Sequence, residues 1–82
     1  MNELSLLGRI HSDPRILDGK PVVRGTRLPV ETVLKRLAGG ETPEVLLREH
    51  ARLEPEDIRA CLLFAGQAVE DCVSLPLSAM EA

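Results

Sequence analysis

Aromatic side chains are almost absent from this chain. Its 82 residues include no tryptophan, no tyrosine and a single phenylalanine, Phe64. A hydrophobic core must therefore be built from leucine, valine, isoleucine and alanine, which suits a small helical domain. The length permits one domain with a modest core, and such a core gains from burial of further surface in a partner or in a second copy of the chain.

Cysteine is also scarce, and its spacing argues against both a disulfide and a metal site. Cys61 and Cys72 would lie roughly 16 Å apart on one continuous helix, which is too far for a disulfide. We interpret them as small apolar residues of a cytosolic protein. His11 and His50 are isolated in the sequence, and there is no Cys-x-x-Cys or His-x-x-x-His pair. The sequence thus predicts a binding protein rather than an enzyme, without metal or other cofactor.

Long hydrophobic runs are lacking as well. No stretch reaches the length of a transmembrane helix. The first residues lack the basic start and the apolar stretch of a secretory leader. We therefore expect a cytoplasmic protein that makes no contact with a membrane.

Positive charge is concentrated near the start of the chain, although the net charge is −3. Residues 1–30 carry five Lys and Arg against three Asp and Glu, whereas residues 31–82 carry five against ten. The first part could therefore bind phosphate or a carboxylate-rich surface. The remainder is a poor electrostatic match for nucleic acid.

A basic run lies within residues 19–30. Lys20, Arg24 and Arg27 occur there with no acidic residue among them. The sequence predicts a small N-terminal β-hairpin whose two extended pieces flank Arg24 and Gly25, because a glycine can adopt the positive φ that a tight turn requires. This hairpin could bind a negatively charged partner or serve only as a structural lid.

Three helices are predicted after the hairpin. Apolar residues at helical spacing indicate a helix over 29–38, which Gly39-Gly40 would end. Pro43 and Pro55 suit the first turn of a helix and indicate helices over 43–50 and from 55 to about 72. The fold class is therefore mainly α with a small β-hairpin.

The segment before the hairpin has weaker signals. We expect residues 1–8 to form a loosely held arm and residues 9–12 to form a short strand. Ile16 and Leu17 are expected to enter the core from a single helical turn, between turn signals at Asp13-Pro14 and Asp18-Gly19.

The order of the three helices is a helix-turn-helix pattern. In DNA-binding proteins of this class the third helix enters the major groove with its N-terminal residues. Here these residues include Glu54, Glu56 and Asp57, whose carboxylates would repel phosphates, and Arg52 and Arg59 offset this only in part. The sequence therefore predicts a three-helix domain in which DNA binding, if any, uses the basic hairpin.

The third helix is apolar on two sides, so most of its surface must be covered. One stripe contains Ile58, Cys61 and Leu62, and the other contains Leu63 and Phe64. The N-terminal segment could cover the second stripe, or a partner could. For a partner interface, including a homo-oligomeric one, we select two residues of this helix and three of the apolar segment that follows it: Leu63, Phe64, Leu75, Leu77 and Met80.

These motifs resemble the family known as domain of unknown function 433. The resemblance covers roughly residues 9–70 and rests on Asp13-Pro14 and on the runs 19–30, 37–44 and 53–60. It implies a winged or homeodomain-like helical fold. It also implies the role of antitoxin in a type II toxin–antitoxin pair, whose partner resembles a PIN-like ribonuclease. Glu54 departs from the family, which often has Ser or Thr at this position.

The resemblance and the residue analysis together give an antitoxin-like binding module in three parts. Residues 1–28 form the arm and basic hairpin, residues 29–72 the three-helix core, and residues 73–82 an apolar C-terminal tail. The module would neutralise the nuclease by occluding its active site. A DNA-binding regulator that acts through the hairpin on operator DNA, and a homo-oligomeric scaffold, remain alternatives.

The residues expected to enter the nuclease site are basic. An Arg or Lys could pair with the acidic residues that hold Mg²⁺ in such an enzyme and exclude the metal. Arg24 and Arg27 are the first candidates, and Arg9 and Lys20 follow. The same residues are the candidates for binding nucleic acid.

Overall fold

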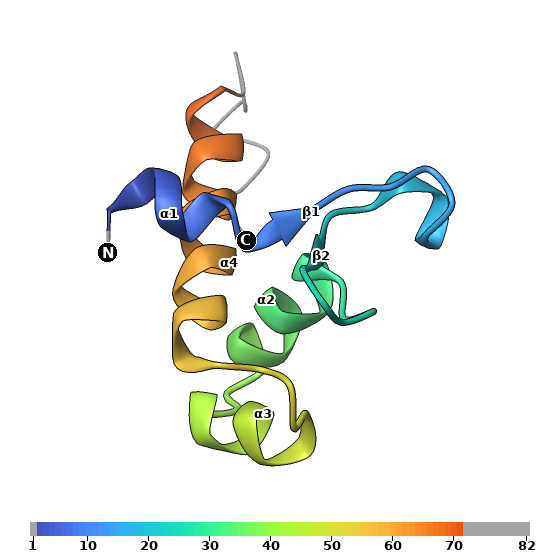
Figure 1. The fold of residues 1–82 in the computed structure, drawn as a ribbon. Coiled ribbons are helices and arrows are strands. Elements are labelled where there is room, and N and C mark those ends of the chain that lie inside the picture. The colour runs from blue at the N-terminus through green and yellow to red at the C-terminus, as the bar shows by residue number, and fades with distance from the viewer. Residues whose placement is uncertain (1, 72–82) are drawn as a thin grey trace.

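A computed structural model describes residues 2–71, and within them the chain is mainly helical, with four α-helices and one two-stranded antiparallel sheet (Figure 1). The elements are, in chain order, α1 (Glu3–Leu7), β1 (Ile10–His11), a 3₁₀ turn η1 (Leu17–Gly19), β2 (Val22–Val23), α2 (Val30–Ala38), α3 (Pro43–Glu49) and α4 (Pro55–Glu70). The strand predicted over 9–12 and the three helices predicted after the basic run are confirmed, with helix ends that differ by one or two residues.

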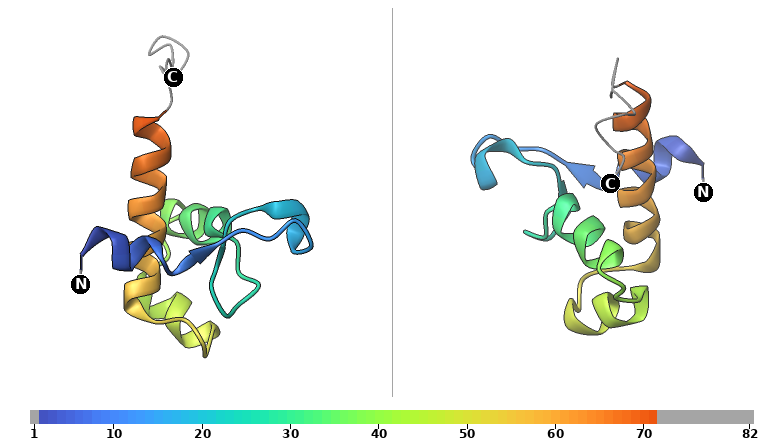
Figure 2. Two further views of the ribbon diagram at one scale, coloured as in Figure 1. Left: turned by 45° about the horizontal axis from the view of Figure 1, so that its top comes forward. Right: turned by 180° about the vertical axis from the view of Figure 1, so that it is seen from behind.

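The longest helix, α4, organises the domain. Helix α1 crosses α4, while α2 and α3 lie toward its N-terminal end (Figures 1 and 2). The core between these elements is aliphatic, as the lack of aromatic residues predicts, and Phe64 packs at its edge. Its buried residues are Val23, Leu28, Val30, Val33, Leu46, Leu53, Ile58 and Cys61.

The first residues differ from the loosely held arm expected for them. They form helix α1, in which the side-chain oxygen of Asn2 accepts a hydrogen bond from the Ser5 N–H at 2.8 Å. Leu6 is buried as α1 packs on α4. A helix this short is unstable alone, so its packing against α4, which lies far along the chain, accounts for it.

The β-structure also differs from the expected hairpin. The main partner of β2 is β1, with Ile10 opposite Val23 and His11 opposite Val22. The predicted pairing across Arg24-Gly25 is reduced to a single bridge between Val22 and Pro29. Proline has no N–H to donate, so the ladder cannot extend through Pro29, and the chain enters α2 at once.

The connection between the strands projects from the body of the domain (Figures 1 and 2). It contains three consecutive residues with positive φ, Leu17, Asp18 and Gly19. Leu17 is 46% exposed and Ile16 is half-buried. The expectation that Leu17 enters the core is therefore wrong, because the left-handed backbone at this position turns its side chain outward.

The two apolar stripes of α4 are distributed differently from the prediction. Ile58, Ala60 and Cys61 are buried, but Leu62 is 51% exposed and Val69 is 63% exposed. The elements that pack on α4 leave the face with Leu62 and Val69 uncovered, so the stripe that contains Leu62 is split between core and solvent. None of the described helices has the combination of length and hydropathy required to cross a bilayer.

Candidate functional site

The turn at Arg24-Gly25 is the centre of the candidate site. Gly25 has φ +81°, and the Thr26 N–H donates to the Val23 carbonyl at 3.0 Å, which closes the turn. The Thr26 hydroxyl donates to the same carbonyl at 2.8 Å and accepts from the Leu28 N–H at 3.0 Å. These bonds fix the turn on both sides of Gly25, so it is a rigid support for the arginines at its ends.

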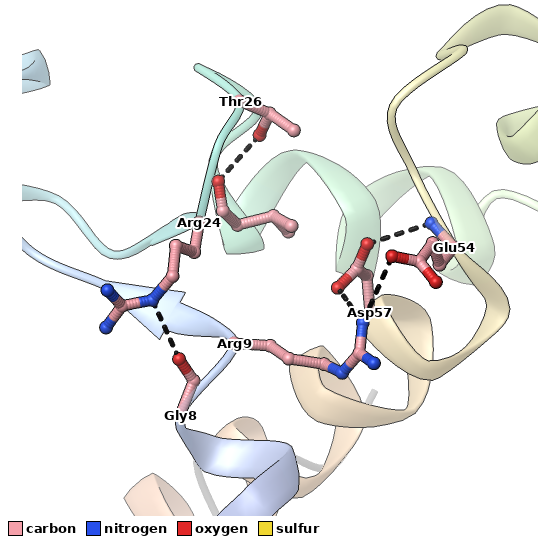
Figure 3. Close-up of polar contacts among 7 residues, drawn as sticks. Gly8, Arg9, Arg24, Thr26, Glu54 and Asp57 are labelled. Atoms are coloured by element: carbon pink, nitrogen blue, oxygen red, sulfur yellow. Dashed lines mark hydrogen bonds and ion pairs between the residues drawn. The ribbon is translucent and has the colours of Figure 1, made fainter.

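Arg24 is held at the surface by main-chain atoms. Its backbone N–H donates to the Arg9 carbonyl at 2.7 Å. Its Nε donates to the Gly8 carbonyl at 2.9 Å, as Figure 3 shows. These two bonds orient the guanidinium. Both acceptors are neutral carbonyl oxygens, so the bonds do not neutralise its positive charge. Its two terminal nitrogens donate no hydrogen bond to another residue within 2–71, so they can donate to an external acceptor.

Arg52 joins this surface from the loop between α3 and α4. Its Nη1 donates to the Gly25 carbonyl at 3.3 Å, although the two residues are 27 positions apart. Sequence reasoning did not select Arg52, because nothing local relates it to the turn. We call the exposed set Arg24, Arg27 and Arg52 the basic turn face.

Two open hollows flank the turn, and Arg52 lines both. The first, of about 450 Å³, is also lined by Arg24, together with the Arg9, Glu54 and Asp57 cluster. The second, of about 670 Å³, also contains Arg27. Within residues 2–71 Arg27 makes no ion pair. The basic turn face thus offers guanidinium groups to a ligand on either side of Gly25.

Lys20 does not belong to this face, although the sequence suggests a cation without an acidic neighbour. Its Nζ lies 2.6 Å from Oε1 of Glu31 in α2. The hydrogen bond from Lys20 lowers the pKa of the Glu31 carboxyl and raises the pKa of Lys20. The expectation that Lys20 is unopposed is therefore wrong, since helix α2 brings a carboxylate to it from outside the basic run.

Arg9 is likewise engaged within the domain. Its Nη1 donates to Asp57 Oδ1 at 3.0 Å and lies 3.7 Å from Glu54 Oε1 (Figure 3). The hydrogen bond to Asp57 raises the pKa of Arg9. Arg9 and Arg24 extend in opposite directions in Figure 3, although both line the hollow of about 450 Å³. Arg9 therefore stabilises the fold, and its guanidinium is already paired with Asp57 at the wall of this hollow.

The acidic N-terminal end of α4 should repel phosphate less than its sequence predicts. Asp57 is only 5% exposed, pairs with Arg9, and accepts a hydrogen bond from the Glu54 N–H at 2.8 Å. Glu56 is half-buried and Glu54 is exposed. The expected row of three exposed carboxylates is therefore wrong, because Asp57 is used as an N-terminal helix cap.

The residues selected as a partner interface fall into two groups. Phe64 packs partly against the core and Leu63 is half-buried, so Leu62 and Val69 present more apolar surface on α4. The other three selected residues, Leu75, Leu77 and Met80, lie outside the described residues.

No group of three metal-ligating side chains occurs among residues 2–71. Cys61 is buried in the core, and burial raises the pKa of its thiol to about 11, so the reactive thiolate is suppressed. The ring Nε2 of His50 is buried and makes no hydrogen bond within the described chain. Among the described residues the basic turn face is therefore the strongest candidate site.

Comparison of the sequence with known families gives one family match. Residues 10–65 match the family described as "Protein of unknown function (DUF433)". The chain belongs to the DUF433 family. The matched range of this DUF433 domain contains all three arginines of the basic turn face, and it begins after α1.

Two proteins are similar to this DUF433 domain, one found by sequence and one by structure. The uncharacterized protein y4eO of Sinorhizobium fredii is 43% identical over 56 residues, which are 68% of this chain but 25% of that protein. The chain therefore spans about a quarter of that relative. A crystal structure of a DUF433 member protein from Anabaena variabilis has a TM-score of 0.73 at 28% identity, and the likeness covers 82% of this chain and 66% of that one.

Proposed function

We propose that this DUF433 domain is a non-enzymatic binding module of the antitoxin type, which neutralises a PIN-like ribonuclease by placing guanidinium groups in its acidic active site. The observation that carries the proposal is the rigid Arg24-Gly25 turn, whose basic face has exposed arginines from two parts of the chain. Its partner would be the nuclease of a type II toxin–antitoxin pair, and the domain itself would be a helix-turn-helix of winged or homeodomain-like type.

The chemistry of the turn supports an acidic partner. A guanidinium can donate two parallel hydrogen bonds to a carboxylate, which makes it a strong and geometrically selective ligand. The carboxylates of such a nuclease hold Mg²⁺, so an arginine bound to them competes with the metal. The bond from Arg24 to the Gly8 carbonyl orients the side chain in advance, which reduces the entropy lost on binding.

Reconstitution with the product of a neighbouring nuclease reading frame tests the proposal. We expect the double variant Arg24→Gln, Arg27→Gln to bind the nuclease less tightly in calorimetry and to restore RNA cleavage. Arg48→Gln is the matched control, because Arg48 is an exposed arginine of α3 that lines neither of the two hollows beside the turn. Full inhibition by the double variant would exclude the basic turn face from the nuclease site.

A second candidate function is DNA binding by the same face. The neutralisation of Asp57 by Arg9 and the position of Arg52 beside Arg24 favour it, since both reduce the repulsion of phosphate near α4. Removal of Arg24, Arg27 and Arg52 would then lower affinity for operator DNA and reduce the salt slope by roughly 0.9 for each phosphate that the variant no longer neutralises. Abolished DNA binding together with unchanged nuclease inhibition would assign the basic turn face to DNA rather than to the nuclease.

A further inference from the structure

A largely apolar groove is formed by residues other than those of the basic turn face. It has a volume of about 480 Å³ and is formed by the end of α1, by β1 and by the last turns of α4. Leu7, Ile10, Phe64 and Ala68 supply its apolar walls, and Asp71 lies at the end where α4 stops. The groove follows one face of α4, because Phe64, Ala68 and Asp71 are spaced at helical intervals.

Within residues 2–71, the main chain of Ile10 has no hydrogen-bond partner on the edge of β1 that borders this groove. The Val23 N–H, opposite Ile10, donates to the Leu28 carbonyl, while the Arg24 N–H donates to the Arg9 carbonyl. Ile10 and Val23 are therefore a pair of the non-hydrogen-bonded type, and the N–H and C=O of Ile10 point away from β2. An extended segment in the groove could use this donor and acceptor.

The sequence that follows Asp71 fits such a segment. Val73, Leu75 and Leu77 alternate with Ser74, Pro76 and Ser78, which gives one apolar face in an extended conformation. Pro76 falls on the other face, and proline is tolerated in a strand at a sheet edge. The interval from Phe64 to Asp71 covers about 10 Å of helix, and five extended residues reach about 16 Å, so the lengths are compatible.

We propose that residues 73–77 occupy this groove of their own chain, extended along the open edge of β1, with Val73, Leu75 and Leu77 against Ile10 and Phe64. The covalent connection at Asp71 favours this occupant over a separate molecule, because a short tether gives a high effective concentration. The inference goes beyond the proposed function. It means that Leu75 and Leu77, selected from the sequence for a partner, are covered in the free chain.

Phe64 provides a sharp test, because it is the only aromatic residue of the chain apart from the histidine rings. In the full chain with labelled methyl groups, we expect nuclear Overhauser effects between the Phe64 ring and the methyl groups of Leu75 or Leu77. Leu77→Ser should weaken them and should make exchange of the Ile10 amide hydrogen roughly tenfold faster. Leu4→Ser is the matched control, because Leu4 is exposed on α1 and does not line the groove.

A mixture of labelled and unlabelled chains separates the possible occupants. Effects that arise within one labelled chain support the proposal. Effects found only between a labelled and an unlabelled chain overturn it and assign the groove to a second copy. Absence of any contact between residues 73–77 and Phe64, with an Ile10 amide that exchanges equally fast in the Leu77→Ser variant, overturns it in favour of an external partner. None of these variants changes a core residue, so the readout does not depend on a variant that fails to fold.

Discussion

Arg9 and Asp57 form an ion pair across 48 residues of sequence, with Nη1 3.0 Å from Oδ1. The carboxylate is buried, and its second oxygen accepts the Glu54 N–H at the start of α4. The Asp57 side chain thus caps helix α4 and connects this helix to Arg9, the residue before β1. The pair also removes Arg9 from the set of cations that the sequence offered for binding.

Loss of the Asp57 carboxylate should destabilise the fold. We expect Asp57→Ala to lower the free energy of unfolding by about 2 kcal/mol, because the Glu54 N–H loses its acceptor and Arg9 loses its buried partner. Arg9→Gln should destabilise in the same direction. Arg15→Gln is the control, since within residues 2–71 exposed Arg15 forms its one ion pair with nearby Asp13. Urea unfolding monitored by circular dichroism measures all three, and equal midpoints for Arg9→Gln and Arg15→Gln would contradict the role given to Arg9.

Two glycine substitutions separate backbone strain from crowding. A Cβ at Gly25 would meet no atom within 4 Å, but φ is +81° there, so Gly25→Ala should cost about 1–2 kcal/mol of stability. Gly66 also has no atom within 4 Å of an added Cβ and lies in the interior of α4 without a positive φ. Gly66→Ala should therefore stabilise the domain by about 0.5–1 kcal/mol. Thermal unfolding of both variants gives the signs, and stabilisation by Gly25→Ala would mean that the turn is not rigid.

Stability should decline in acid as the carboxylates that pair with Lys and Arg become protonated. The hydrogen bonds from Arg36 to Glu41 and from Lys20 to Glu31 lower the pKa of each carboxyl below its ordinary value of 4.5. A carboxyl with a lowered pKa in the folded state stabilises the fold above its unfolded pKa, and this contribution is lost as the pH falls through the folded pKa. Unfolding free energy should therefore fall from pH 4.5 downward.

The Arg36–Glu41 pair can be isolated in that acid profile. Glu41→Gln should flatten part of the decline, because the variant has no carboxyl to protonate at this position. Glu44→Gln is the control, since Glu44 is exposed and forms no ion pair among residues 2–71. Identical acid profiles for the two variants would show that the Arg36 contact does not persist in solution.

The exposed apolar residues of α4 should support self-association. Leu62 and Val69 are two turns apart on one face and both are largely exposed. We expect sedimentation of the unmutated chain to detect an assembly, which Leu62→Glu with Val69→Glu disrupts at unchanged helix content. Phe64→Glu should instead reduce helix content as well, because Phe64 packs against the core. A clean monomer for the unmutated chain at micromolar concentration would refute the expectation.

Local signals predict much of this fold. Pro43 and Pro55 mark the first residues of α3 and α4, and Gly39 follows the last residue of α2, because proline and glycine act through their own backbone geometry. The turn at Gly25 is found for the same reason. These features require no knowledge of the rest of the chain.

The composition of the candidate site could not be predicted in this way. Arg52 reaches the Gly25 carbonyl, Arg9 reaches Asp57, and Glu31 reaches Lys20 only after α2 and α4 have packed. The distribution of charge along the sequence points to four cations for the site, and two of them are engaged in ion pairs within the domain. Pairing between distant residues therefore decides which charges remain at the surface.

The position of α4 has a consequence for synthesis of the chain. The core residues of the earlier elements pack around Ile58 and Cys61, and α1 has its main contact on the same helix. A nascent chain that has emerged only as far as α3 lacks the surface on which these elements assemble. Folding on the ribosome is therefore delayed until most of α4 has left the exit tunnel, and until then the leucines of α1 remain available to chaperones.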